Sequence, residues 1–399
     1  MVVEESVAGL CPDVSVIIPT YKEAANLPVL IPRLSQAFEK AGKRLEVIVV
    51  DDNSPDDTKA VCRALAEQFP LRLETRVGER GLSSAVVHGL RLARGASLVV
   101  MDADLSHPPE RCPDLVAALD QPGVDFVIGS RYVPGGSTYA GWTAYRWLNS
   151  QVATLLARPF TSVKDPLAGF FALRADTFLR ADKLDPVGYK IGLELIVKCK
   201  CRNVVEVPIA FEERLHGQTK LTLGEQVNYL RHLKRLFDYK AGSLAQVIQF
   251  VTVGATGSVV DLLSLKVLLA LMPFPLARGV AIWVAMTWNF YLNRRLTFSY
   301  ARRNHFLPQY LMFCGACCLG AAVNWGVSVA LPMTSAFFAG RPFLAAFCGI
   351  VAGTGFNYSL SRFVVFRKSR RQVRVIEPAA PLAAAEPLDG ADLAAAHAS

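Results

Sequence analysis

Two aspartates, Asp102 and Asp104, directly follow an apolar run at residues 98–101. The run has no polar alternation, which is typical of a strand buried on both faces. In an open α/β sheet ligands bind where strands end, and side-chain alternation puts both carboxylates on one side of the backbone. Such a pair needs a cation, and oxygen ligands suit Mg²⁺ or Mn²⁺ bridged to substrate phosphates. The pair predicts a metal–diphosphate site, although an Asp- and Pro-rich turn that merely caps a strand would carry the same D-x-D spacing.

The chain around this pair alternates between strand and helix patterns. Apolar runs predict strands at 14–19, 45–50, 71–76, 98–101, 125–131 and 204–208, and helical spacing predicts helices at 24–40, 56–69 and 81–93. This order predicts a mostly parallel α/β sheet with helices on both faces. Side chains after two earlier strands, Tyr21 with Glu23 and Asp52, would then join the aspartate pair at one edge of the sheet.

The composition divides the 399 residues into two parts. The chain is 52% hydrophobic with a mean hydropathy of +0.29, and the excess lies in long apolar runs at 242–366. The net charge of +9 favours a membrane surface or a phosphorylated substrate as partner, and no nucleic-acid-binding motif is recognisable. We therefore expect a soluble α/β domain followed by a membrane domain.

The domain boundaries and the cellular compartment are predicted from the same composition and sequence patterns. We expect an N-terminal extension at 1–13, a catalytic domain at 14–222, an amphipathic interface helix at 223–241, a membrane domain at 242–366 and a disordered basic, then Ala/Pro-rich, tail at 367–399. The acidic N-terminus lacks a basic region and an apolar core, so no signal peptide is expected. Nine scattered cysteines fit a reducing cytosolic face.

Four apolar segments are long enough to span a membrane. They lie at about 246–271, 277–298, 307–331 and 343–366. Arginines and lysines cluster between the second and third segments and after the fourth, whereas the other two connections hold only Arg278 and Arg341. The positive-inside rule then predicts four spans with both termini in the cytosol.

The membrane region also contains an internal repeat. Phe250, Gly257, Val260 and Asp261 match Phe313, Gly320, Val323 and Asn324 at one constant offset. Asn289, Leu292, Arg294 and Phe298 match Asn357, Leu360, Arg362 and Phe366 at another. The repeat predicts a duplicated helical hairpin.

Two stretches before the membrane region are amphipathic, at 142–160 and 223–240. Basic amphipathic helices with aromatic residues commonly lie in the membrane interface, and core packing is the alternative. Both readings stay open for the first stretch. The interface is favoured for the second because it leads into the apolar region.

Seven motifs together resemble one family. They lie at 19–23, 51–55, 81–85, 102–110, 129–132, 165–171 and 214–220. In number, order and spacing, they resemble the family 2 glycosyltransferases and, within these, the polyprenyl-phosphate (dolichol-phosphate) mannose synthases. Residues 242–366 resemble the GtrA-like four-helix membrane domain that some of these synthases carry.

The resemblance implies a GT-A (Rossmann-like) fold and inverting transfer of mannose from GDP-mannose to a dolichyl or undecaprenyl phosphate. It implies nucleotide-sugar contacts from Pro19, Tyr21, Glu23, Val50, Asp52, Asp102, Ala103, Asp104, Arg131, Arg214 and Lys220. It implies metal contacts from Asp102 and Asp104. Asp104, Arg131 and Lys220 are the candidate catalytic residues. The family often has Gln at the third metal position, where this chain has the shorter Ser106.

The residue chemistry agrees with that reading. The attacking group would be a phosphate oxygen, which is largely ionised near neutral pH, so no general base is required. What is required is a set of cations that hold two mutually repelling phosphate groups, and Arg131, Arg214 and Lys220 can supply it. His107, which precedes two prolines, is predicted to be structural.

Two other functions remain open at this point. The same fold and site would serve a polyprenyl-phosphate glucosyltransferase that uses UDP-glucose. A lipid-linked sugar translocase is a different class, and the polar Asn289, Asn357 and Asp261 within predicted spans keep it open.

Overall fold

The computed structural model describes residues 11–139, 141, 143–185, 190–213 and 223–367. The chain forms two compact units, Met1–Gly242 and Ser243–Ser399. We call them the catalytic unit and the membrane unit.

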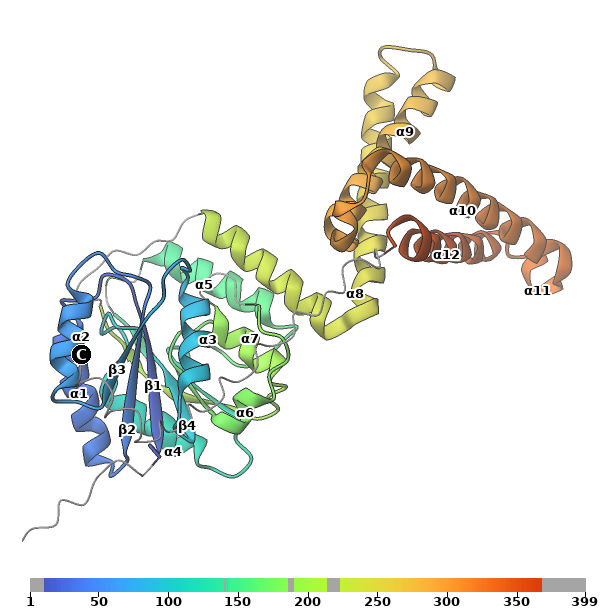
Figure 1. Cartoon of the computed structure of the whole chain (residues 1–399). Helices are drawn as coiled ribbons and strands as arrows, with labels where there is room; N and C mark the ends of the chain where they lie inside the picture. The colour runs from blue at the N-terminus through green and yellow to red at the C-terminus, as the bar shows by residue number, and fades with distance from the viewer. Residues whose placement is uncertain (1–10, 140, 142, 186–189, 214–222, 368–399) are drawn as a thin grey trace, which may run out of the picture. The chain divides into compact units, whose positions relative to one another are not determined.

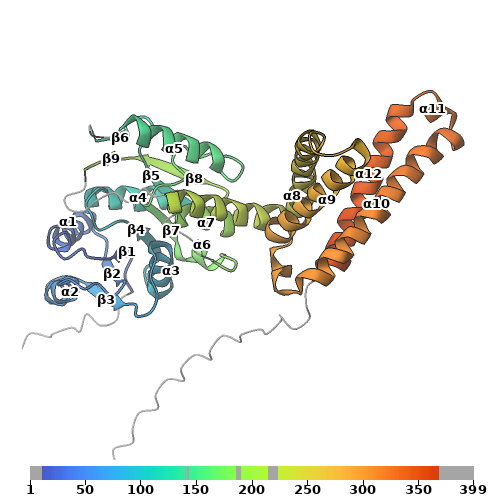
Figure 2. The same cartoon turned by 90° about the horizontal axis from the view of Figure 1, so that it is seen from above.

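The catalytic unit is built on a seven-stranded sheet of order β3-β2-β1-β4-β7-β5-β8 (Figures 1 and 2). Its strands are β1 (Val14–Thr20), β2 (Leu45–Asp51), β3 (Leu71–Thr75), β4 (Ser97–Val100), β5 (Phe126–Ser130), β7 (Phe171–Arg174) and β8 (Val204–Pro208). All pairings are parallel except those of β7, which runs antiparallel to both β4 and β5. A small second sheet pairs β6 (Ser137–Thr138) with β9 (Ala210–Phe211). The predicted mostly parallel sheet is confirmed, and β7 is a strand that we did not predict.

Helices cover both faces of the large sheet (Figures 1 and 2). They are α1 (Leu27–Lys40), α2 (Thr58–Ala66), α3 (Leu82–Leu92), α4 (Cys112–Leu119), α5 (Ala144–Ala157), α6 (Ala175–Leu179) and α7 (Ile191–Lys198), with a 3₁₀ turn at Pro109–Arg111. Side chains of α1 and α4 share one apolar cluster with the strands, and those of α3 and α7 share another. In α1 the buried residues Leu27, Leu30, Leu34 and Phe38 recur at helical spacing, and proline stands in its first turn, where no amide donor is lost.

The amphipathic segment at 223–240 forms the first half of α8 (Leu223–Leu268). Tyr229, Leu233 and Leu236 on this helix are buried against Leu167 and Leu193 of the catalytic unit. One face of the segment is therefore core, as in the core-packing alternative, and its location at the membrane interface stays a prediction. At Gly242 the backbone leaves the helical region, with φ 50° and ψ −118°, a conformation that favours glycine.

The membrane unit continues with long helices. They are the rest of α8, α9 (Phe274–Leu292), α10 (Phe306–Thr334) and α12 (Pro342–Leu360), with the short helix α11 (Ala336–Ala339) between the last two. Single π-helical turns, η2 (Asn293–Thr297) and η4 (Ser361–Val365), follow α9 and α12, and a 3₁₀ turn, η3 (Ser299–Arg303), precedes α10. Among the residues that the structure describes, two helices, Gly224–Leu268 and Phe306–Thr334, are long and apolar enough to cross a membrane, with hydropathies of 1.5 and 1.6.

The sequence repeat corresponds to repeated local structure in the membrane unit. The side chain of Asn289 lies directly over Gly257, and that of Asn357 lies over Gly320. A Cβ atom on either glycine would approach the amide oxygen to about 2 Å, so neither position has room for a larger residue. The residues that follow the two π-helical turns, Phe298 and Phe366, stack on each other with ring centroids 4.7 Å apart.

Candidate active site

The aspartate pair lies at the carboxyl end of β4, as predicted. Asp104 is buried, and Ser106 donates to its Oδ1 from both the hydroxyl (2.6 Å) and the backbone amide (3.1 Å). Leu105, between them, has φ 63°, which bends the chain sharply enough for these local bonds. Ser106 is thus placed beside Asp104 as predicted, and its hydroxyl hydrogen is engaged by that carboxylate.

The side chain of His107 holds the same turn through a hydrogen bond and a ring contact. It is buried and stacks on Phe170 with ring centroids 5.1 Å apart. Its Nδ1 accepts a hydrogen bond from the backbone amide of Asp102 at 3.2 Å, which assigns the ring hydrogen to Nε2 in the neutral form. Burial lowers the pKa of His107, although the charges of Asp102 and Asp104 oppose this shift. The contacts agree with the predicted structural role.

Arg131 follows β5 and forms an ion pair with the buried carboxylate of Asp165. It donates to Asp165 from the backbone amide (3.1 Å), Nε (2.8 Å) and Nη2 (2.8 Å). Burial would lower the pKa of Arg131, but the hydrogen bonds and charge of Asp165 outweigh it and raise the pKa. Glu206 in turn accepts from the backbone amide of Asp165 at 3.0 Å, which fixes the loop that carries the carboxylate.

Lys190 is a further cation near this centre, and sequence reasoning missed it. Its Nζ donates to the carbonyl of Leu167 at 3.3 Å. Burial, followed by repulsion from Arg131, lowers the pKa of Lys190 to about 7, and Asp165 and Asp102 oppose the shift. A single lysine before an apolar helix carries no sequence signal, because only the fold brings it near Arg131.

The predicted nucleotide residues lie at the ends of β1 and β2. Pro19 and Val50 are register partners in these strands, and both are buried. Tyr21 is partly exposed, with the guanidinium carbon of Arg80 5.0 Å from its ring centroid. Glu23 accepts from the side chain of Asn26 at 2.6 Å.

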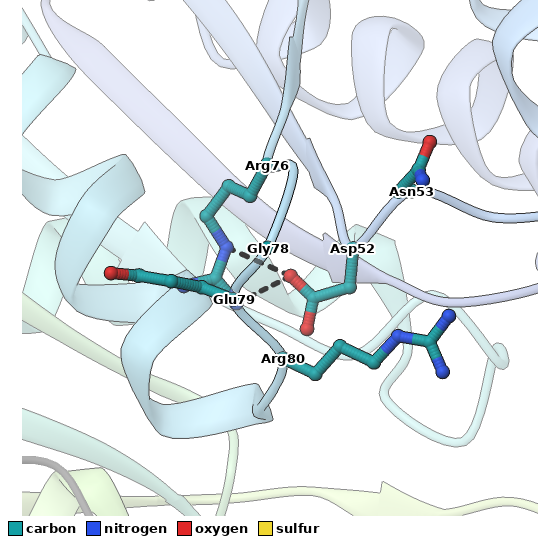
Figure 3. Close-up of a pocket in the computed structure, with 6 residues that line it drawn as sticks. All are labelled: Asp52, Asn53, Arg76, Gly78, Glu79 and Arg80. Atoms are coloured by element: carbon teal, nitrogen blue, oxygen red, sulfur yellow. Dashed lines mark hydrogen bonds and ion pairs between the residues drawn. The ribbon is translucent and has the colours of Figure 1, made fainter.

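Asp52 lines a cavity of about 400 Å³ (Figure 3). The cavity is lined by Asp52, Asn53, Arg76, Gly78, Glu79 and Arg80. Its size falls in the range typical of small-molecule sites. Arg76, absent from the sequence prediction, pairs directly with Asp52.

The structure describes some, but not all, of the residues that were predicted to bind a metal ion or phosphate. Within residues 11–139, 141, 143–185, 190–213 and 223–367, no group of three or more His, Cys, Asp or Glu side chains is arranged to hold a metal. Two aspartates and a serine, with Ala103 buried between the aspartates, leave room in an oxygen shell for water and substrate phosphate, which fits Mg²⁺ or Mn²⁺. Arg214 and Lys220 lie outside the described residues.

A mostly parallel α/β sheet with a cavity and an aspartate pair at its strand ends has the ligand-binding edge of an open α/β fold. Residues 15–180 match Glycosyl transferase family 2, and residues 249–366 match the GtrA/DPMS transmembrane domain, which makes the chain a membrane protein.

Three curated relatives are dolichol-phosphate mannosyltransferases. The Pyrococcus furiosus protein is 39% identical over 359 residues, 88% of this chain and 99% of the relative. The Mycosarcoma maydis protein is 40% identical over 60% of this chain and 84% of its own length, and the Saccharomyces cerevisiae protein is 39% identical over 60% and 91%. The chain therefore belongs to the dolichol-phosphate mannosyltransferase family.

Proposed function

We propose that this protein transfers mannose from GDP-mannose to a polyprenyl phosphate, dolichyl or undecaprenyl, with inversion at the anomeric carbon. One observation carries the proposal: the relationship to the Pyrococcus furiosus dolichol-phosphate mannosyltransferase extends over 359 residues and so includes both units. The cavity beside Asp52 and the aspartate pair after β4 give the same strand edge a place for a nucleotide and for a diphosphate.

In this proposal the donor lies along the ends of β1, β2 and β4. Pro19, Tyr21, Glu23, Val50 and Asp52 bind the nucleoside, and Ala103 lines the path to the diphosphate. Asp102, Asp104 and Ser106 would hold Mg²⁺ or Mn²⁺, which when bound neutralises charge on the leaving diphosphate. The hydrogen bond from Ser106 to Asp104 supports this set, because it orients one carboxylate and leaves the oxygen lone pairs of the serine available.

Basic side chains of the chain bind the donor diphosphate and the acceptor phosphate. In this proposal the guanidinium of Arg131, held by Asp165, binds a phosphate oxygen. Arg214 and Lys220, which come after β9 in the sequence, complete the clamp in this proposal. The acceptor phosphate attacks without a general base, since its oxygen is already largely ionised at neutral pH.

The membrane unit crosses the bilayer four times in this proposal, with the catalytic unit and both termini cytosolic. The basic residues after α9 and α12, at the ends where the π-helical turns lie, support this orientation. On the catalytic unit, α5 exposes Trp147, Leu148 and Leu155, each more than half accessible. A helix with so large an exposed apolar face suits the membrane interface, where the lipid acceptor resides.

The test is a transfer assay with membranes that contain the full-length protein, a polyprenyl phosphate and labelled donor. Labelled GDP-mannose should yield a mannosyl lipid, and labelled UDP-glucose should yield none. A glucosyl lipid instead would replace the donor assignment with the glucosyltransferase alternative. Absence of any labelled lipid, with both donors bound, would contradict the proposal and favour the translocase alternative.

A further inference from the structure

The two π-helical turns of the membrane unit carry arginines that match in the sequence repeat but differ in their partners. Arg294 is the second residue of η2, and Arg362 is the second residue of η4. Nη2 of Arg294 donates to the backbone carbonyls of Arg302 and Asn304, at 2.9 and 2.8 Å. Arg294 therefore stabilises the connection between α9 and α10, which is a role in the fold.

Arg362 bonds to hydroxyl groups instead of backbone. Its Nη1 donates to Oη of Tyr358 at 2.9 Å, and its Nη2 donates to Oγ of Ser243 at 3.1 Å. A guanidinium has no acceptor, so each hydroxyl accepts here and its own hydrogen is directed elsewhere. Within the part of the chain that the structure describes, neither hydroxyl donates to a further acceptor. The three side chains therefore present several hydrogen-bond donors around one positive charge.

No carboxylate within residues 243–367 lies close enough to neutralise this charge. The sequence of this segment contains a single acidic residue, Asp261. Asp261 and Ser243 both lie on α8, about 27 Å apart along the axis at the helical rise per residue. Arg362 bonds directly to Ser243, so Asp261 is far beyond the reach of an ion pair. An anion from outside this segment would complete the group.

The group lies where two helices of the membrane unit end. Ser243 begins the apolar part of α8, directly after the break at Gly242, and Tyr358 lies in the last turn of α12. The 19 residues of α12 rise about 28 Å, close to the thickness of the hydrocarbon core of a bilayer. In the proposed arrangement of four spans, this end of α12 lies at the cytosolic surface, where lipid headgroups are found.

We propose that Arg362, Tyr358 and Ser243 form a binding site for the phosphate group of a membrane lipid. A phosphate supplies both the negative charge and the acceptor oxygens that these donors require, and a guanidinium matches its geometry. Basic pockets between membrane helices on the cytosolic side bind lipid headgroups by the same chemistry. An anionic phospholipid and a polyprenyl phosphate share this group. The inference rests on the proposed crossing of the membrane by α12, and it does not depend on which sugar is transferred.

The experiment counts lipids bound to the full-length protein by native mass spectrometry from a neutral detergent. The probes are phosphatidylglycerol, a polyprenyl phosphate and inorganic phosphate, each added separately. Arg362→Gln should weaken the binding of one lipid about tenfold, because charge-assisted hydrogen bonds to the phosphate are lost. Weakening for phosphatidylglycerol identifies a phospholipid site. Loss of one bound polyprenyl phosphate, with another still bound, identifies a second site for the acceptor lipid.

Arg295→Gln is the matched control, because it removes the same charge from the same end of the membrane unit. Arg295 follows Arg294 in η2, and the stacked rings of Phe298 and Phe366 place the ends of the two π-helical turns together. The side chain of Arg295 is exposed, with its guanidinium carbon 5.0 Å from the ring centroid of Tyr291. Lipid binding by this variant should stay within about twofold of the wild type, since an exposed charge acts only at long range.

Tyr358→Phe keeps the ring and the net charge but removes one hydroxyl from the group. It should weaken the binding of the same lipid severalfold, and it tests the inference even if Arg362→Gln fails to fold. Equal weakening by Arg362→Gln and Arg295→Gln would indicate a diffuse basic surface and overturn the inference. Unchanged binding of both lipids in Arg362→Gln, or binding of inorganic phosphate alone, would also overturn it. A protein that fails the transfer assay but keeps lipid binding dependent on Arg362 would lose the proposed function and retain this site.

Discussion

Asp165→Asn removes the charge that holds Arg131 while keeping the size of the side chain. Asp165 has no exposed surface, and it accepts three N–H bonds from Arg131, whose side chain is only 12% exposed. Removing one partner of a buried ion pair costs about 3–5 kcal/mol, and because asparagine keeps one acceptor oxygen we expect the lower end, ~3 kcal/mol. For a unit of this size that loss lowers the Tm by about 6–12 °C.

The same substitution should also reduce transfer. The amide nitrogen of asparagine would face a guanidinium N–H, so the guanidinium must move, and a shift of about 1 Å in a group that binds the reacting phosphate costs roughly a hundredfold in rate. Thermal unfolding of the purified full-length protein and initial rates of lipid mannosylation measure the two effects. The donor concentration should be saturating, so that the rate reports the transfer step.

Asp125→Asn is the matched control. Asp125 pairs with Arg180 at 2.7 Å and accepts two backbone N–H groups, but Arg180 is 47% exposed, so the loss should be about 1 kcal/mol or less. Transfer by this control should be normal. If Asp165→Asn were no less stable than Asp125→Asn and transferred mannose within threefold of the wild type, Asp165 would not position Arg131 for catalysis.

Three further predictions concern the turn after β4. Asp104→Ala should abolish transfer and leave the protein folded in the membrane, and near-normal turnover at saturating metal would remove this residue from the mechanism. Ser106→Gln should tighten Mg²⁺ or Mn²⁺ binding or change the preference between them, and an unchanged metal titration would mean that position 106 does not reach the ion. His107 takes up a proton less readily in the folded than in the unfolded chain, because burial lowers its pKa, so the stability that it contributes is present above pH 6.5 and is lost as the pH falls further. His107→Gln should make the decline of Tm between pH 7 and pH 5 shallower, and an unchanged decline would refute this account.

The strand ends were predictable because they depend on local pattern. Apolar runs at 16–19, 47–50 and 98–101 mark β1, β2 and β4 as buried. The carboxyl ends of parallel strands meet at one edge of the sheet, so Asp52 and the aspartate pair could be placed there. The four-residue strand β7 could not be found in this way. A short apolar run does not by itself distinguish a strand from a buried helix segment, and the antiparallel place of β7 between β4 and β5 depends on pairing with distant segments.

The repeat in the membrane unit could be predicted from the sequence for a different reason. Glycine and asparagine are conspicuous in apolar helices, and their recurrence at constant offsets matched Gly257 with Gly320 and Asn289 with Asn357. The contact of each asparagine with a glycine is seen only in the structure. The break in α8 was not predicted, because Gly242 lies where an amphipathic pattern gives way to an apolar one and both patterns are helical.

The contacts that hold the candidate site were less predictable than its motifs, because two of the three contacts join residues that lie far apart in the sequence. Asp165 holds Arg131, Arg76 holds Asp52, and His107 holds the backbone of Asp102. Arg131 lies 34 positions from Asp165, and Arg76 lies 24 from Asp52, separations at which neither pattern nor propensity constrains the pairing. These buried contacts fix the charged groups before a ligand arrives, so little reorganisation is needed when a diphosphate develops charge. The sequence motifs thus identify the groups that are proposed to bind the ligand, and the fold supplies the partners that hold Arg131, Asp52 and the backbone of Asp102 in place.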